Sequence, residues 1–176
     1  MPTKRTAFWL LLAVTLAVHG TMLLWSLPQV SRAAGGLAPF DMRPSGYSVD
    51  EARAFLAALS GEGRQFYAVV QHRLDWFYPA LLAATLCCAV AALLPGPRGY
   101  WRWLVAAPVM SVMFFDYAEN AAVAALLSAD PASLDAAAVE RASHWTVLKS
   151  NATTVAMIVV LALLGCRGIA RLRARR

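Results

Sequence analysis

Four long apolar segments follow one another along the chain, at about residues 7–28, 75–95, 103–127 and 145–166. Each is long enough to cross a bilayer as an α-helix, which takes roughly 20 predominantly apolar residues. The connections after the second and third segments are short, and the Pro-Gly-Pro sequence at residues 95–97 is a strong helix stop. Short connections place consecutive helices antiparallel and side by side. The pattern predicts an all-α membrane protein, a four-transmembrane-helix up-down bundle that forms a single domain over residues 1–176.

The longest connection, residues 29–74, carries a pattern of its own. Ser48 and Glu51 have the spacing of a capping box, in which each side chain bonds the backbone of the other residue. The apolar residues after it share one helix face: Val49, Ala52, Leu56 and Leu59. This indicates a short amphipathic helix over about residues 48–60, lying at the mouth of the bundle or in the membrane interface. Both a structural brace and a lid over a pocket fit such a helix.

The composition supports membrane embedding. The chain has 176 residues, of which 60% are hydrophobic and only 15% are charged, more apolar surface than a soluble domain of this length buries. The first apolar segment is longer than the 7–15 residues of a signal-peptide core, so we interpret it as an uncleaved helix.

The distribution of basic residues predicts the orientation. Lys and Arg occur without any Asp or Glu at residues 4–5, 98–102 and 167–176, which are both ends of the chain and the second connection. By the positive-inside rule both termini are cytoplasmic, in a multi-pass protein of a bacterial inner membrane. The net charge of +6 arises mainly from the Arg-rich C-terminal tail, beside no soluble domain. We therefore expect the lipid bilayer and its anionic headgroups as partners, at about 1 kcal/mol per basic residue, and no nucleic acid.

The third apolar segment contains ionisable residues. Asp116, Glu119 and Asn120 stand at positions i, i+3 and i+4, so they project from one helix face. A carboxylate inside a membrane span costs ~2.5 kcal/mol or more, so such groups face a protein interior or a wet cavity and have a partner. Lys149 in the fourth segment is the candidate partner.

Other polar residues are predicted to fall at a similar depth. They come from the first helix and from the helix that leads into the second span: His19, Arg64, Tyr67, Asp75 and Tyr78. The cytoplasmic halves of the segments are nearly free of polar residues. We therefore expect a polar cavity that opens outward, with Asp75 and Arg64 at its mouth.

Three interpretations of this intramembrane charge cluster remain open. The charges could only fix helix register, as in an assembly or accessory subunit, since interhelical polar contacts average about 0.6 kcal/mol. They could bind a small amphipathic or cationic ligand. They could also handle protons or act as acid and base in a membrane enzyme on a lipid-like substrate, because Asp75, Asp116 and Glu119 outnumber the one lysine. We favour the ligand pocket and assign no catalytic residue.

No pattern indicates a metal or a cofactor. The cysteines form no C-x-x-C pair, and the histidines have no ligand spacing; they are Cys87, Cys88 and Cys166, and His19, His72 and His144. The sequence also identifies no protein partner.

Several short motifs carry a resemblance: Gly46-Tyr-Ser-x-x-Glu51, Gly63-Arg64-x-x-Tyr67, Asp75-x-x-Tyr78-Pro79, Phe115-Asp-Tyr-x-Glu-Asn120 and Lys149. In these the chain resembles small bacterial four-helix integral membrane proteins, to which no activity is attached. More loosely, it is similar to the four-helix sterol isomerase and sigma-2 receptor fold in holding acidic residues in a membrane pocket. That similarity implies a small lipid-like ligand.

Overall fold

A computed structural model describes residues 3–94 and 101–174, with the backbone alone for residues 101–106. Every regular element in this part of the chain is helical. Four helices are long and apolar enough to cross a membrane: Lys4–Ala33, Gly61–Leu93, Ala107–Ser128 and Ala136–Arg173. The all-α class and the four potential spans are therefore confirmed, and they are compatible with a multi-pass membrane protein.

Two of the long helices are interrupted by a π-helical turn. The first consists of α1 (Lys4–Thr21), the π turn η1 (Met22–Ser26) and α2 (Leu27–Ala33); the second of α4 (Gly61–Phe66), the π turn η3 (Tyr67–Gln71) and α5 (His72–Leu93). The other two are α6 (Trp101–Ser128) and α7 (Ala136–Arg173). The connections contain the 3₁₀ turn η2 (Phe40–Met42), the helix α3 (Val49–Ala58) and the 3₁₀ turn η4 (Pro131–Ser133). Single π turns inside α-helices occur frequently at functional sites.

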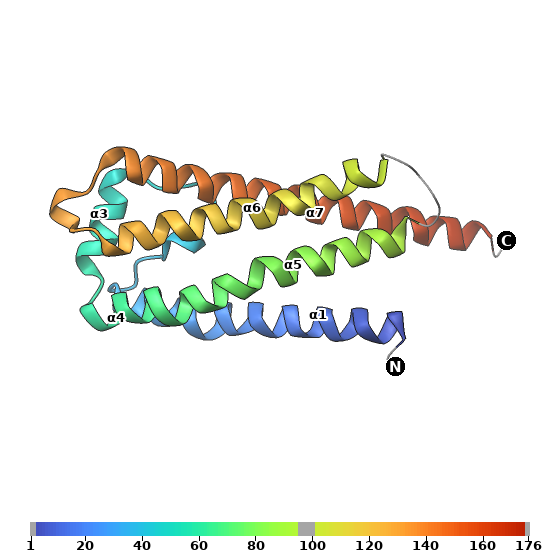
Figure 1. Ribbon diagram of the computed structural model, residues 1–176, viewed down its shortest axis with the longest axis horizontal. Helices are drawn as coiled ribbons and strands as arrows, with labels where there is room; N and C mark the ends of the chain where they lie inside the picture. Colours follow the sequence, from blue (N-terminus) through green and yellow to red (C-terminus); the bar gives the residue numbers. More distant parts are fainter. Residues whose placement is uncertain (1–2, 95–100, 175–176) are drawn as a thin grey trace.

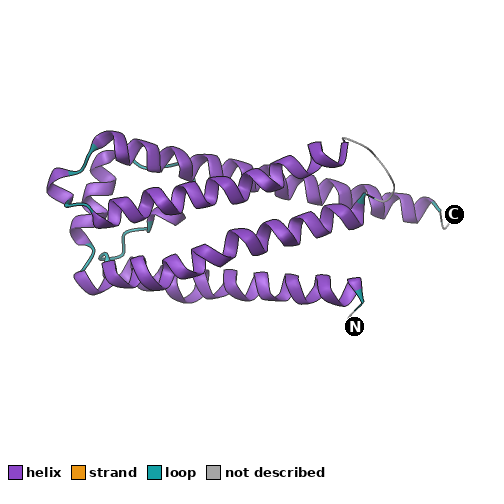
Figure 2. Cartoon of the chain, in the orientation of Figure 1, coloured by secondary structure: helices purple, strands orange, loops and turns teal. Residues whose placement is uncertain are grey.

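The long helices lie roughly side by side along the long axis of the molecule (Figure 1), joined by short loops (Figure 2). Helix α6 packs against both α5 and α7, and α1 packs mainly against α5. Both chain ends lie at one end of the molecule, and α3 lies at the other, which we call the α3 end. The Pro-Gly-Pro turn expected at residues 95–97, together with Arg98 and the last two arginines, lies outside the described residues.

The helices extend beyond the apolar segments that predict them. The second long helix begins at Gly61, where the Ser60 hydroxyl accepts a hydrogen bond from the Gly63 amide at 3.0 Å. Helix α7 begins at Ala136, where Asp135 accepts a bond from the Ala137 amide at 3.0 Å. Capping residues, rather than the edge of the apolar segment, thus determine where these helices start. With 38 residues α7 is roughly 57 Å long, so it exceeds the hydrocarbon thickness.

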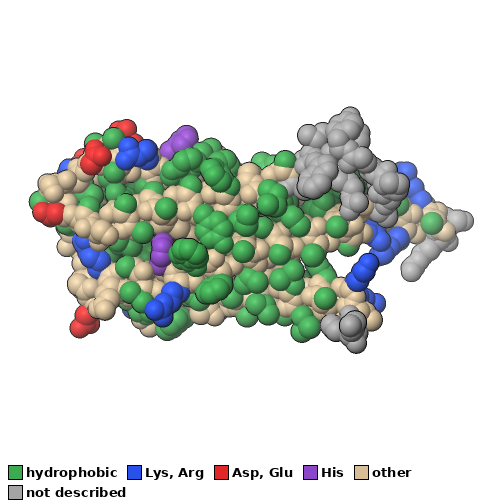
Figure 3. Space-filling view, viewed as in Figure 1, with side chains coloured by type: hydrophobic (Ala, Val, Ile, Leu, Met, Phe, Trp, Pro, Cys, Tyr) green, Lys and Arg blue, Asp and Glu red, His purple; other side chains and the backbone are tan. Residues whose placement is uncertain are grey.

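Charged side chains lie toward the two ends of the visible face in Figure 3, with hydrophobic side chains between them. Asp and Glu gather at the α3 end, and basic side chains are prominent toward the C-terminal end. Such a band of apolar surface between charged ends is typical of a protein that crosses a bilayer.

Two clusters of buried hydrophobic residues hold the helices together. The α3-end core joins α3 and the loop before it to the long helices, and includes Val30, Phe40, Phe55, Tyr67, Leu126 and Val139. The second core, in the half of the molecule nearer the termini, joins α5, α6 and α7 through Leu86, Val90, Val109, Val112, Ala156 and Val160. Helix α1 is attached to α5 in this half by a hydrogen bond between the Thr15 and Thr85 hydroxyls, 2.8 Å long. The level between the two cores is where the polar residues of the spans meet.

The capping box at the start of α3 is present. The Ser48 amide donates to Glu51 Oε2 at 2.7 Å, and the Glu51 amide donates to the Ser48 hydroxyl at 3.2 Å. The helix then buries one face, with Ala52, Phe55 and Leu56 nearly inaccessible to solvent. The box therefore sets the point at which this helix begins above the α3-end core.

Replacing Ser48 by Ala should destabilise α3 by about 1 kcal/mol, because the helix loses its N-cap. Hydrogen exchange of the α3 amides should accelerate accordingly. The hydrogen bonds from Ser48 also lower the pKa of the Glu51 carboxyl. The contribution of Glu51 is therefore present above the unfolded-state pKa and is lost as the pH falls through the folded-state pKa. Unchanged exchange rates in the Ser48→Ala protein would contradict a stabilising role for the box.

Candidate functional site

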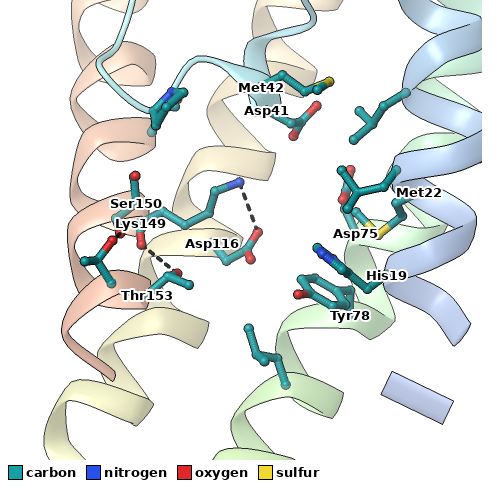
Figure 4. Close-up of a pocket in the computed structure, with 16 residues that line it drawn as sticks. His19, Met22, Asp41, Met42, Asp75, Tyr78, Asp116, Lys149, Ser150 and Thr153 are labelled. Atoms are coloured by element: carbon teal, nitrogen blue, oxygen red, sulfur yellow. Dashed lines mark hydrogen bonds and ion pairs between the residues drawn. The ribbon is translucent and has the colours of Figure 1, made fainter. Parts of the chain in front are cut away.

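A cavity of about 380 Å³ lies in the bundle between the two hydrophobic cores. All four long helices and the loop around η2 contribute to its wall (Figure 4). The polar and charged groups facing it include His19, Asp41, Asp75, Tyr78, Asp116 and Lys149. Several ionisable groups from distant parts of the sequence thus meet around one space.

Lys149 connects α7 to α6 at one side of the cavity. Its ammonium group pairs with Glu119 and lies 3.8 Å from Asp116 Oδ1. The Glu119 side chain is completely buried, whereas Lys149 keeps 17% of its side-chain surface exposed and borders the cavity. One lysine therefore lies close to two carboxylates: Glu119 behind the cavity wall and Asp116 on the wall.

Three buried polar atoms behind this wall have no hydrogen-bond partner among the described residues: the Tyr47 hydroxyl and both carboxylate oxygens of Glu119, of which Oε2 pairs with Lys149. Burial raises the pKa of the Tyr47 phenol above its usual range, and the nearby charges of Glu119 and Asp41 raise it further. Tyr47 is therefore a neutral hydrogen-bond donor. Its own backbone is fixed, because its amide donates to the Ser143 hydroxyl at 2.8 Å.

Asp75 is held on the cavity wall by neutral donors. Gln71 Nε2 donates to both carboxylate oxygens, at 3.1 and 3.2 Å, and the Ser26 hydroxyl donates to Gln71 Oε1 at 2.5 Å. The side chain of Asn120 donates to the Asp75 backbone carbonyl at 3.1 Å. Ser26 and Gln71 are the last residues of the two π turns, which contact each other. The two interruptions in the helices thus meet at the residues that orient this carboxylate.

Asp41 comes from the loop and reaches the same cavity (Figure 4). It accepts a hydrogen bond from the Tyr67 hydroxyl. The preceding residue, Phe40, is completely buried and packs on the rings of Tyr47 and Phe55. The buried aromatic ring anchors the loop, and the adjacent carboxylate is turned toward the cavity as a result.

The remaining predicted residues have different places. His19 stacks on Tyr78, with ring centroids 5.2 Å apart, and both line the cavity. Tyr67 and Asn120 lie behind the wall and orient Asp41 and Asp75, as described above. Arg64 does not line the cavity. Its guanidinium donates to the carbonyl oxygens of Leu127 and Ala129 at 2.8 and 3.0 Å, so it caps the end of α6.

The sequence interpretation did not include Asp41 or, among the hydroxyl groups of α7, Ser150 and Thr154. The α7 hydroxyls, together with Lys149, form the α7 side of the cavity: Thr146, Ser150, Thr153 and Thr154. A signal for Asp41 exists in the sequence, because it stands between Phe40 and Met42 in an otherwise Gly- and Pro-rich loop. An acidic residue flanked by large apolar residues indicates a loop segment that turns inward.

Acidic groups outnumber basic groups around this cavity. Three carboxylates, Asp41, Asp75 and Asp116, face it, whereas Lys149 is already paired with Glu119. No Lys, Arg or His in the described residues lies within salt-bridge distance of Asp41 or Asp75. The charges of Asp41 and Asp116 repel that of Asp75, and the charge of Lys149 attracts it from beyond salt-bridge distance. The site can therefore offer a positively charged group two negatively charged partners.

The described residues contain no group of three or more His, Cys, Asp or Glu that could hold a metal ion. The opposite part of the cavity wall is apolar, with Met22, Leu23, Leu27 and Leu82. The chemistry of the wall thus suits an organic molecule with both a charged and an apolar part.

Comparison of this chain with protein-family models, with curated proteins and with solved structures finds no match.

Proposed function

We propose that the chain is a multi-pass protein of the bacterial inner membrane, folded as an up-down bundle with both termini in the cytoplasm. The basic residues of the two chain ends support this orientation by the positive-inside rule. The α3 end is then extracytoplasmic, and α3 is an amphipathic helix over the bundle mouth. The cavity lies in the outer half of the membrane.

The function we propose for this cavity is the binding of a small amphipathic cation. The observation that carries the proposal is the pair Asp41 and Asp75, which faces the cavity without a basic partner in the described part of the chain. A buried charge without a partner is costly, so buried Asp75 and partly buried Asp41, which face the same cavity, are best explained by a cation that joins them. An ammonium group, including a quaternary one without N–H, provides this positive charge and is attracted electrostatically to both carboxylates.

The rest of the cavity suits the apolar part of such a molecule. Its volume of about 380 Å³ lies at the small end of the usual range for ligand pockets, about 300–1,000 Å³. Methionine and leucine side chains from η1, α2 and α5 cover the wall opposite Lys149. The Met22 and Met42 side chains are flexible and adapt to ligands of different shape.

The alternative of a purely structural charge cluster explains only part of the site. The Lys149–Glu119 pair joins α7 to α6, and an accessory subunit could use it to fix helix register. Asp41 and Asp75 belong to no ion pair among the described residues, so they join no helices through charge. An enzyme acting through Glu119 is less well supported, because this group lies behind the wall and does not border the cavity.

Chemical modification can test the outward pocket. We expect Ser150→Cys, in a chain whose native cysteines are replaced by Ala, to react with a membrane-impermeant thiol reagent from the extracytoplasmic side. Dodecyltrimethylammonium should slow this reaction at least tenfold, because Ser150 lines the cavity. The rate can be followed by mass spectrometry in oriented vesicles.

Ser128→Cys is the matched control, because this residue is exposed near the end of α6 and does not line the cavity. It should react at the same rate with and without the ammonium compound. The proposal fails if the Ser150→Cys protein does not react while folded, or if ammonium compounds give it no protection.

A further inference from the structure

The cavity is enclosed unevenly by the four long helices. Helix α1 packs on α5, and α7 packs on α6 and α5, but α1 and α7 have no extensive contact in the described part of the chain. Both nevertheless line the cavity, with His19 and Leu23 on the first helix and Ser150 and Thr154 on α7. The cavity therefore reaches the side of the bundle between α1 and α7.

The other sides are lined by packed segments of the chain. The loop around η2 covers the cavity with Met42 and Pro44, and buried Phe40 anchors this loop. At Gly46 the loop lies so close to α7 that an added Cβ would be 2.6 Å from the Ser143 hydroxyl. On the opposite side Leu82 lies next to the core formed by α5, α6 and α7. A ligand that uses the α1–α7 side avoids displacing either core.

The surface around this side opening is apolar. Leu23, which lines the cavity, is 43% exposed, and its neighbour Leu24 is 85% exposed. On α7, Val155 and Ile158 are 47% and 59% exposed, close to Thr154. In a helix that crosses a bilayer such residues contact lipid chains. This side opening therefore leads into the hydrocarbon region, in addition to the outward access of the proposed pocket.

We infer, on the basis of the proposed function, that the ligand is a long-chain amphipathic cation that enters from the membrane through the opening between α1 and α7. Its ammonium group lies at Asp41 and Asp75, and its hydrocarbon chain passes between Leu23 and Thr154. The small volume of the cavity agrees with this arrangement, because it accommodates a headgroup and leaves a long chain to pass outward. The chain then remains in contact with the lipid.

Binding of two ammonium ions that differ only in chain length tests this inference. The full-length protein in phosphatidylcholine nanodiscs is titrated calorimetrically with tetramethylammonium and with dodecyltrimethylammonium, and empty nanodiscs provide the blank. Bulky residues are placed on either side of the opening as Leu23→Trp and Thr154→Trp. Matched controls are Leu10→Trp and Leu161→Trp, residues of the same two long helices that are exposed and do not line the cavity.

We expect Leu23→Trp and Thr154→Trp each to weaken binding of the dodecyl compound at least tenfold. Binding of tetramethylammonium should change less than twofold in these variants, because this ion has no hydrocarbon chain to pass through the opening. The two controls should bind both ions within twofold of wild type. Because the two substitutions lie on different helices, a local folding defect at one position would not explain the same effect at both. The melting temperature of each variant reports whether it is folded.

The outcomes separate the two proposals. Two results would overturn the lateral route while leaving the proposed pocket intact, provided that tetramethylammonium binds. In the first, the dodecyl compound binds no more tightly than tetramethylammonium. In the second, neither Leu23→Trp nor Thr154→Trp weakens binding of the dodecyl compound. If neither ion binds the wild-type protein, the proposed function fails, and this inference fails with it. If Thr154→Trp instead breaks a dimer of the chain, the opening is an interface between two copies and the inference is overturned.

Discussion

Replacing Lys149 by Met should lower the free energy of unfolding by about 3–5 kcal/mol, because breaking a buried ion pair leaves an uncompensated charge. The partner left behind is Glu119, which is completely buried and has Oε1 without a hydrogen-bond partner in the described residues. Asp116 loses the same cation, although it borders the cavity, where water can reach it. We expect this substitution to have the largest effect on stability of any single change at the site.

Thermal unfolding in detergent can measure the effect. Substitutions of the two carboxylates near Lys149, Glu119 and Asp116, provide the comparison. Lys149→Met combined with Glu119→Gln should recover most of the lost stability, because the buried negative charge is then removed as well. Asp116→Asn should change stability by less than about 1 kcal/mol, since interhelical polar contacts average about 0.6 kcal/mol. Its 3.8 Å separation from Lys149 is longer than that of a close ion pair. A Lys149→Met protein that melts at or above the wild-type temperature would contradict a structural role for the pair.

This comparison divides the acidic residues into two groups with different expected roles. Glu119 is buried behind the wall with its cation and contributes to the packing of α6 on α7. Asp41 and Asp75 face the cavity and form no ion pair in the described part of the chain. Asp75 is buried, so its charge is retained against stability. Asp116 lies between these groups, since it borders the cavity and also lies near Lys149.

Helical periodicity in the sequence was sufficient to predict which side chains of α6 project together. Asp116, Glu119 and Asn120 are separated by three and four residues, and all three are buried on the inner face of the helix. The apolar length of each segment was sufficient to predict four possible spans. Both predictions depend on local spacing along a single helix, which the sequence contains in full.

Positions that depend on contacts between distant segments were not predicted. Asp41 reaches the cavity because Phe40 is buried against the rings of Tyr47 and Phe55. The apolar neighbours of Asp41 indicate an inward turn of the loop, but they do not indicate which cavity it reaches. Arg64 was expected at the mouth but caps α6, since its carbonyl partners are more than 60 residues away in the sequence. The π turns ending at Ser26 and Gln71 are also absent from the periodic pattern. Each adds one residue to a turn and so changes which residues face inward afterwards.

Replacing Asp75 by Asn should weaken the binding of tetramethylammonium by at least about 30-fold, which corresponds to about 2 kcal/mol. The reason is that an ammonium group in this cavity loses one of the two carboxylates that have no other cation. Asp41→Asn should have a similar effect, and the double substitution should abolish measurable binding. Calorimetric titration of the full-length protein in phosphatidylcholine nanodiscs provides the measurement.

Asp50→Asn provides the matched control, because it removes the same charge from a side chain that is 91% exposed on α3. Its pair with Arg53 is a surface salt bridge, worth about 0–1 kcal/mol, so both stability and binding should remain close to wild type. The Asp75→Asn protein should unfold at the wild-type temperature or above it, since an uncompensated buried charge has been removed while Gln71 can still bond the new amide oxygen. A lower melting temperature together with unchanged binding would reverse the assignment, making Asp75 a structural residue and leaving the cavity without its cation site.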